Sequence, residues 1–189
     1  FIQKKISFNL ITSFAMFYDI DEPNYFCRDI YKLLKPNGVW ILELSYLPLM
    51  LKNLTYDQIC HEHVAYYTLN SFNKIVKKNN LKLIDINFNE INGGSAEVVV
   101  AKKASKRKIN IEKIKKVFEQ EQLINFSSYK KFNLRLQNMK KIINNFFSNN
   151  KKKIVGYGAS TKGNIILNHC KIDSNDIKYI GDGNPQKWE

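Results

Sequence analysis

Apolar residues gather in short runs that alternate with amphipathic segments over the first hundred positions of this chain. The run Ile6–Phe17 predicts a buried strand of a parallel sheet, and Val39–Leu44 predicts its neighbour. Between them, Asp21-Glu22-Pro23 signals a helix start, because acids and proline favour the first turn of a helix. Apolar residues follow at helical spacing, at Phe26, Ile30, Leu33 and Leu34. This stretch therefore predicts a βαβ unit.

A second set of elements follows an irregular, tyrosine-rich stretch. Lys35-Pro36-Asn37-Gly38 predicts the turn that ends the first helix, and a further short helix is expected from Ser71. A strand is expected over Leu81–Phe88. Asn92-Gly93-Gly94-Ser95 is a strong turn signal, so Ala96–Ala101 is expected to return antiparallel. Together these elements predict a mostly parallel sheet with one reversed edge strand.

The pattern changes beyond residue 104. Apolar positions then recur at helical spacing and predict one or two helices; they are Ile111, Ile114, Phe118, Tyr129, Phe132, Leu136, Ile143 and Phe146. Asn149–Lys153 interrupts this stripe. Ile154–Asn164 predicts a short strand, a glycine-bearing turn and a helix, and Ile177–Ile180 a further strand. The expected organisation is an α/β half-domain over residues 1–104, a helical connector over 105–150 and the beginning of a second Rossmann-like domain over 151–189.

Composition narrows the class of protein. Hydrophobic residues make up 44% of the chain, which is ordinary for a globular protein with a core. No apolar run approaches the roughly 20 residues of a membrane-spanning helix, and no signal peptide is visible. Three widely spaced cysteines do not form a disulfide framework, so a cytoplasmic location is expected. Cys27 and Cys170 are expected to pack as small hydrophobic residues.

The net charge of +13 suggests nucleic-acid binding as one alternative. Nearly all of the positive charge is lysine, however. Arginine is the better ligand for phosphates and base edges, because its planar guanidinium donates two hydrogen bonds at once. A solvated lysine-rich surface is therefore favoured over a specific nucleic-acid site.

The stretch best suited to chemistry is Cys60-His61-Glu62-His63. Histidine exchanges a proton near neutral pH, and an adjacent carboxylate can orient an imidazole and stabilise its protonated form. The segment follows a parallel strand, at the edge where open α/β sheets bind their ligands. A polar surface loop is the plainer alternative. A zinc site made of Cys60, His61 and His63 is another, although the spacing matches neither CxxC nor HExxH.

Glycine-bearing turns are the next candidates for ligand binding. In Gly156-x-Gly158-x-x-x-x-Gly163, backbone amides at the start of a helix can approach a phosphate, and Lys162 adds a positive charge. The spacing matches neither GxGxxG nor a P-loop, so tight packing explains these glycines equally well. Gly93-Gly94-Ser95 is open to the same two interpretations. Tyr66 and Tyr67 either line a pocket or pack in the core.

Five of these segments, taken together in order, resemble one family. They are Phe14–Asp19, Cys60–Tyr67, Asn92–Ser95, Gly156–Asn164 and Asn184-Pro185. They are similar to the sugar C-methyltransferases that use S-adenosylmethionine. Those enzymes consist of an N-terminal zinc-binding module, a central class I methyltransferase domain and a C-terminal Rossmann-like domain. The resemblance covers essentially the whole chain and implies a fragment lacking both ends, with the zinc module and the glycine-rich cofactor loop upstream of Phe1.

The resemblance also implies a reaction. A methyl group would be transferred to carbon on a nucleotide-linked sugar or a related small metabolite, with His63 as the general base and Glu62 beside it. Cys60 and Asp19 stand where better-described members have tyrosine and histidine. Residues implied to border S-adenosylmethionine are Phe14, Ala15, Met16 and Phe17. Residues implied to bind the substrate are Tyr66, Tyr67, Gly94, Gly156, Gly158 and Lys162.

A carbon acceptor requires a base, because carbon becomes nucleophilic only when a proton beside a keto group is removed. An O- or N-methyltransferase on the same scaffold is the alternative, and it needs no strong base.

A first prediction concerns cofactor binding. With the glycine-rich loop expected upstream of Phe1, these 189 residues alone should bind S-adenosylmethionine weakly or not at all. Isothermal titration calorimetry measures this directly, and tight binding by the isolated chain would contradict it.

Overall fold

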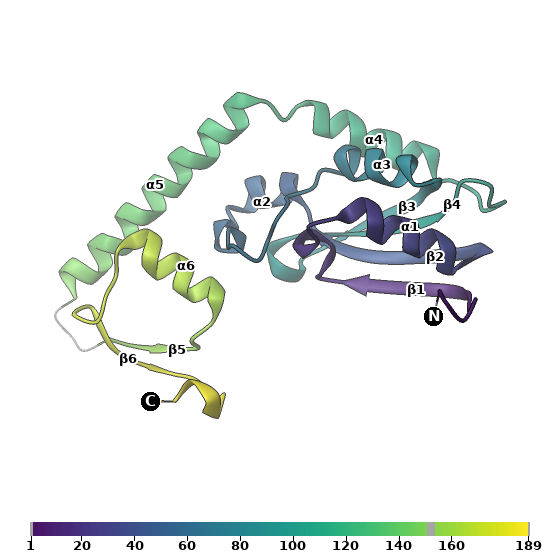
Figure 1. Ribbon diagram of the computed structural model, residues 1–189. Helices are drawn as coiled ribbons and strands as arrows, with labels where there is room; N and C mark the ends of the chain where they lie inside the picture. Colours follow the sequence, from purple (N-terminus) through teal and green to yellow (C-terminus); the bar gives the residue numbers. More distant parts are fainter. Residues whose placement is uncertain (1, 151–153, 189) are drawn as a thin grey trace. The chain divides into compact units, whose positions relative to one another are not determined.

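The computed structural model describes residues 2–150 and 154–188 (Figure 1). The chain forms two compact units. The first contains the residues up to Asn53 together with Glu62–Phe126, and the second contains Leu54–His61 together with the residues from Ser127 onward. The expected boundaries at residues 104 and 150 remain predictions. Lys151–Lys153, on which the start of the last expected segment falls, lie outside the described residues.

A four-stranded sheet forms the centre of the first unit. Its strands are β1 (Phe8–Phe14), β2 (Leu34–Ser45), β3 (Leu81–Asn89) and β4 (Ser95–Lys102), in the order β1-β2-β4-β3. β1 and β2 are parallel, and β4 is antiparallel to both β2 and β3. The structure confirms the parallel pair and the late hairpin.

The predicted position of the reversed strand is wrong, because β4 lies inside the sheet and not at its edge. β4 is almost continuously apolar from Ala96 to Ala101, which suits a strand with a neighbour on each side. β3 alternates apolar residues with Lys82, Asp85 and Asn87, and charged or polar side chains are typical of an edge strand. The hairpin therefore places β3, and not β4, at the edge.

Helices cover one face of this sheet (Figure 1). They are α1 (Pro23–Leu33), α3 (Leu69–Lys78) and α4 (Ile111–Gln122), while α2 (Leu47–Asn53) follows β2. Alternate residues of β2 point toward the helices, so Trp40, Leu42 and Leu44 are buried in the hydrophobic core. Phe72 and Val76 of α3 fill the same core. Burial of Cys27 there confirms that it packs as a hydrophobic residue, and burial raises the pKa of its thiol to about 12.

β1 is not the buried strand that its apolar run predicts. Leu10 is 52% exposed and Phe14 is 54% exposed, whereas Ile11 on the opposite face packs against the core. The prediction of burial is wrong because, within the described residues, β1 has a neighbouring strand on one side only, which is β2.

The turn predicted over Lys35–Gly38 forms a bulge within β2. Phe8 pairs with Leu34 and Leu10 pairs with Val39, so the residues between Leu34 and Val39 loop out of register. Glycine is required at position 38, because a Cβ atom there would lie 2.7 Å from the carbonyl oxygen of Phe8.

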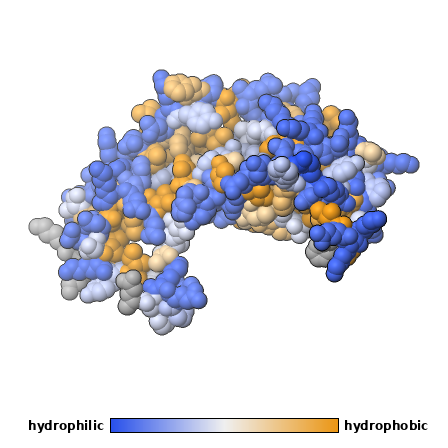
Figure 2. Space-filling view, viewed as in Figure 1, coloured by the Kyte–Doolittle hydropathy of each residue, from blue (hydrophilic) through white to orange (hydrophobic). Residues whose placement is uncertain are grey.

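The apolar stripe predicted for the connector is only partly buried. Ile114 and Val117 of α4 join the core of the first unit. The next helix, α5 (Phe126–Asn149), contains no fully buried residue, and Tyr129 and Phe146 on its stripe are exposed. Figure 2 accordingly shows apolar residues scattered among the hydrophilic ones on the visible surface.

The second unit contains a parallel βαβ unit, as predicted. Its elements are β5 (Ile154–Tyr157), α6 (Thr161–Cys170) and β6 (Ile177–Gly181). The Ser160 side chain caps α6 by accepting a hydrogen bond from the Gly163 amide at 3.1 Å. Cys170 is buried at the end of this helix, as predicted. Across both described ranges, no helix combines the length and apolarity needed to cross a membrane.

A buried carboxylate joins two helices of the first unit to the segment between β2 and α2. Glu121 of α4 accepts hydrogen bonds from the Leu69 amide at 2.5 Å and the Asn70 amide at 2.9 Å, both in the first turn of α3. It also accepts a hydrogen bond from the Tyr46 hydroxyl at 2.7 Å. Burial is the main cause that raises the pKa of Tyr46, and the bond to Glu121 adds to it. A negative charge at this helix start satisfies two amides that have no partner within the helix.

A second prediction tests this junction. Glu121→Ala leaves the buried Leu69 amide, the buried Tyr46 hydroxyl and the more exposed Asn70 amide without their acceptor, so it should lower the free energy of unfolding by about 3 kcal/mol. Tyr46→Phe removes one bond and should cost about 1 kcal/mol. The control is Glu119→Ala, an exposed residue paired with Lys115, which should change stability by less than about 0.5 kcal/mol. Urea denaturation measures all three; equal effects of the two glutamate variants would contradict the assignment.

Candidate active site

A short 3-10 helix, η1 (Phe17–Asp19), follows the carboxyl end of β1. The chain enters it through Ala15, whose φ of 51° is uncommon for a residue other than glycine, and whose amide donates to the Glu43 carbonyl at 3.2 Å. The ring of Phe17 is fully buried. Four aromatic rings lie within 6 Å of it, those of Phe26, Trp40, Tyr67 and Phe72. This packing fixes the position of η1 on the sheet.

His63 lies beside η1. The Ala65 amide donates to the Tyr18 carbonyl at 3.1 Å, which ties the histidine segment to the 3-10 helix. The centroids of the Tyr18 and His63 rings are 4.4 Å apart. The His63 Nε2 atom lies 3.9 Å from Asp19 Oδ1, and the two side chains are 16% and 40% exposed. An imidazole and a carboxylate thus meet at the carboxyl end of β1, the edge where open α/β sheets bind ligands.

The two nitrogens of His63 differ in their surroundings. Nδ1 is buried and has no hydrogen-bond partner among the described residues, whereas Nε2 faces Asp19. Burial raises the pKa of Asp19, nearby His63 lowers it, and nearby Glu62 raises it. Asp19 is therefore a carboxylate beside the imidazole, and the exposed Glu62 raises the pKa of Asp19.

The other residues proposed for the cofactor site lie at different depths. Phe14 and Ala15 are exposed and Met16 is half-buried, so these three can border a ligand at the sheet edge. Phe17 is completely buried in the core. Its ring packs in the core next to the sheet edge, and its role in bordering the cofactor remains a prediction.

The residues proposed for the substrate site also separate. Tyr66 is half-buried, with its ring centroid 6.3 Å from that of His63. Tyr67 is buried in the aromatic core, which favours the packing interpretation. Cys60 is half-buried and His61 is exposed, and both belong to the second unit. Among the residues that the structure describes, no group of three or more His, Cys, Asp or Glu side chains is arranged to hold a metal.

Packing accounts for two of the proposed glycines. Gly94 has a φ of 129°, and a Cβ atom there would lie 2.8 Å from the Cβ of Leu49. A Cβ atom on Gly156 would lie 3.0 Å from Cγ1 of Ile180. Both glycines therefore permit a close approach of backbone to side chain. A role for either in binding a substrate remains a prediction.

Sequence reasoning missed two residues near the site. Tyr18 is buried and provides both the carbonyl and the ring that hold the histidine segment. Glu43 is a buried carboxylate that accepts a hydrogen bond from Asn89 at 3.2 Å. The sequence does contain a signal for Glu43, because an acidic residue within an apolar strand is unusual. No local signal distinguished Tyr18 from the other tyrosines.

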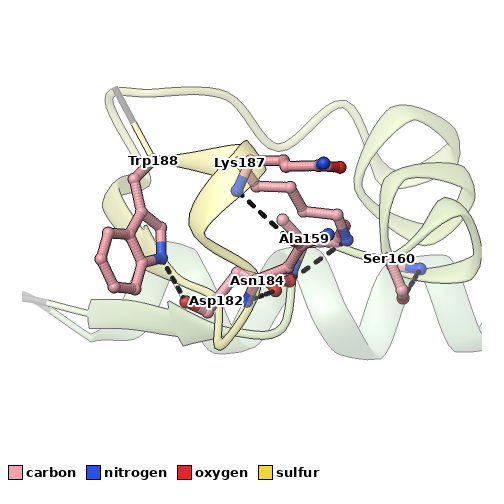
Figure 3. Close-up of polar contacts among 8 residues, drawn as sticks. Ala159, Ser160, Asp182, Asn184, Lys187 and Trp188 are labelled. Carbon is pink, nitrogen blue, oxygen red and sulfur yellow. Dashed lines mark hydrogen bonds and ion pairs between the residues drawn. The ribbon is translucent and has the colours of Figure 1, made fainter.

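A third missed residue, Asp182, organises the glycine turn of the second unit (Figure 3). Its carboxylate accepts hydrogen bonds from the Ala159 amide at 2.7 Å and the Asn184 amide at 2.8 Å. The Lys187 ammonium lies 3.3 Å from the same carboxylate and donates to the Ala159 carbonyl at 2.6 Å. The backbone amide that follows Gly158 is therefore already hydrogen-bonded to a carboxylate of this chain. Lys162 is half-buried in the first turn of α6.

A third prediction concerns the pH dependence of this turn. Hydrogen bonds from the Asn184 and Ala159 amides, followed by Lys187, lower the pKa of Asp182. A lowered pKa in the folded state means that the stabilisation is present above the ordinary carboxyl value of about 3.9 and is lost as pH falls through the lowered value. Amide exchange measured by NMR should show Ala159 and Asn184 protected at neutral pH and less protected in acid. Asp182→Asn should weaken the protection at neutral pH, and Asp173→Asn serves as the control.

Comparison with known proteins identifies the class of fold first. A family profile described as a methyltransferase domain matches residues 3–86, the part that contains β1, β2 and the His63 segment. A second profile, described as the C-methyltransferase C-terminal domain, matches residues 90–189. That match covers more than half of the chain, and the chain therefore belongs to the C-methyltransferase C-terminal domain family. The predicted fold class, the latter half of a Rossmann-like methyltransferase sheet with helices and a second α/β unit, is confirmed.

Individual proteins are similar to parts of this chain. The C-methyltransferase NovU of Streptomyces niveus is 28% identical over 155 residues, which are 79% of this chain and 37% of NovU. The chain thus spans little more than a third of the length of this relative. Magnesium protoporphyrin IX methyltransferase (ChlM) of Synechocystis PCC 6803, solved with bound SAH, aligns at 10% identity and a TM-score of 0.40, covering 53% of this chain and 48% of ChlM. The pyocyanin biosynthetic protein PhzM aligns at 10% identity and a TM-score of 0.41, covering 53% and 33%.

Proposed function

We propose that this chain supplies the acid–base residues of an S-adenosylmethionine-dependent C-methyltransferase acting on a nucleotide-linked sugar or a related small metabolite. Membership of a C-methyltransferase family supports the class of reaction. The observation that carries the chemistry is the position of His63, mostly buried beside Asp19 at the carboxyl end of β1. Three cysteines without a disulfide suit a cytoplasmic enzyme.

The sheet edge offers suitable residues for the cofactor. Phe14, Ala15 and Met16 follow one another at the end of β1, and none of the three is buried in the core. The apolar side chains of Phe14 and Met16 suit contact with the uncharged parts of the molecule. S-adenosylmethionine bound there supplies an electrophilic methyl group.

His63 removes the proton that makes the acceptor carbon nucleophilic. Histidine is the side chain best suited to exchange a proton near neutral pH, so an imidazole in this position can take a proton from carbon beside a keto group. The imidazolium that forms carries a positive charge in a partly desolvated position. The Asp19 carboxylate, 3.9 Å from Nε2, compensates this charge. Tyr18 packs against the ring and limits its rotation.

A fourth prediction tests the base. In a full-length enzyme that contains this chain, His63→Ala should reduce methyl transfer from S-adenosylmethionine to a nucleotide-linked 4-keto sugar by about 10²–10⁴-fold. The same variant should abolish exchange of the substrate proton beside the keto group in deuterated water, followed by NMR. His61→Ala is the matched control, because it changes an exposed histidine two residues away.

The two readouts separate the possible reactions. Loss of both methyl transfer and proton exchange supports carbon methylation through His63. Methyl transfer that survives His63→Ala nearly unchanged contradicts it and favours an O- or N-methyltransferase.

A further inference from the structure

Asp19 provides a polar route away from the His63 ring. Nδ1 is buried without a hydrogen-bond partner among the described residues, so a proton on that atom has no acceptor there. The Tyr18 ring packs against the imidazole, and the Tyr66 ring lies farther off. Asp19 lies beside Nε2, and its side chain is the more exposed of the two. A proton that leaves Nε2 thus meets a carboxylate that contacts solvent.

The geometry of this pair is fixed from both sides. Asp19 is the last residue of η1, which the buried ring of Phe17 anchors to the core. The segment of His63 is tied to the same 3-10 helix by the bond from the Ala65 amide to the Tyr18 carbonyl. The 3.9 Å between Nε2 and Oδ1 exceeds a direct hydrogen bond, but one bridging water can span it.

We propose that Asp19 is the proton outlet of the active site, a residue that carries the proton from His63 to bulk water after each turnover. This inference rests on the proposed function, because the proton is the one that His63 takes from the acceptor carbon. In the step, the N–H bond at Nε2 breaks, the proton moves to an Asp19 oxygen directly or through one water, and neutral imidazole remains. The carboxylic acid then gives the proton to water or a buffer base, which restores the starting state without any redox change.

The electrostatic environment of Asp19 makes this transfer less unfavourable. Burial raises the pKa of Asp19 and the nearby Glu62 carboxylate raises it further, while His63 lowers it. A raised carboxyl pKa reduces the free-energy difference between a protonated imidazole and a protonated carboxylate, so the transfer is less uphill. Glu62, which precedes His63 in the sequence, thus raises the pKa of Asp19.

A fifth prediction can be tested on this chain alone. If the two groups are coupled, the His63 Cε1 NMR signal should show a second, smaller step in acid that coincides with titration of the Asp19 carboxyl carbon. Asp19→Asn should remove this step. Asp29→Asn, which changes an exposed acid paired with Lys32 on α1, should leave it in place. Absence of the step in the natural chain, or its persistence in Asp19→Asn, overturns the proposal.

The kinetic test uses the full-length enzyme and a nucleotide-linked 4-keto sugar. Asp19→Asn should lower turnover at least about tenfold in dilute buffer. Concentrated imidazole buffer should restore part of this loss, because a small base then removes the proton from His63 but does not replace the charge of Asp19. A purely structural role gives a loss that buffer does not restore, and that result overturns the outlet. If His63→Ala remains fully active, the proposed function itself has failed; if His63→Ala is inactive and Asp19→Asn matches the natural enzyme, only the outlet has failed.

Discussion

Burial of the Phe17 ring is the constraint on which the candidate active site depends. Phe17 comes directly after the end of β1, and its ring lies among the rings of the core. Because that ring cannot move without opening the core, the next two residues are held at the sheet edge. Tyr18 then binds the histidine segment, and Asp19 lies beside His63. One buried aromatic side chain thereby connects the hydrophobic core to the candidate active site.

The opposite end of the histidine segment is held independently. The Leu47 amide donates to the Tyr67 carbonyl at 2.9 Å, so the chain is fastened to the end of β2 shortly after His63. It then enters α3, whose first turn is satisfied by Glu121. A loop of irregular backbone is thus fixed by hydrogen bonds at two points, and it carries a half-buried imidazole without being a regular element. Such positioning is what base catalysis requires, since a base must lie within reach of the proton it removes.

The two glycine-bearing regions illustrate why a turn with a ligand-like sequence need not be an open ligand site. Gly94 and Gly156 make room for neighbouring side chains of the chain itself. The Ala159 amide, which follows Gly158 and could otherwise bind an anion, already donates a hydrogen bond to Asp182. A carboxylate in this place disfavours a phosphate, because two negative charges would compete for the same donor. Both glycine-bearing regions lie within residues 90–189, which match the C-methyltransferase C-terminal domain profile.

Local sequence pattern by itself determined the secondary-structure elements. Periodicity, turn residues and caps predict the parallel pair β1 and β2, the late hairpin, the helices of residues 111–149 and the final βαβ unit. The resemblance indicated His63, Glu62, Cys60 and Asp19 as the catalytic residues. Only the tertiary structure decided that β4 lies inside the sheet, that Phe17 is core and that Asp19 is the carboxylate beside the imidazole. Those features arise from packing and hydrogen bonds between segments far apart in the chain, whereas hydrophobic periodicity reports only on neighbours within a few residues.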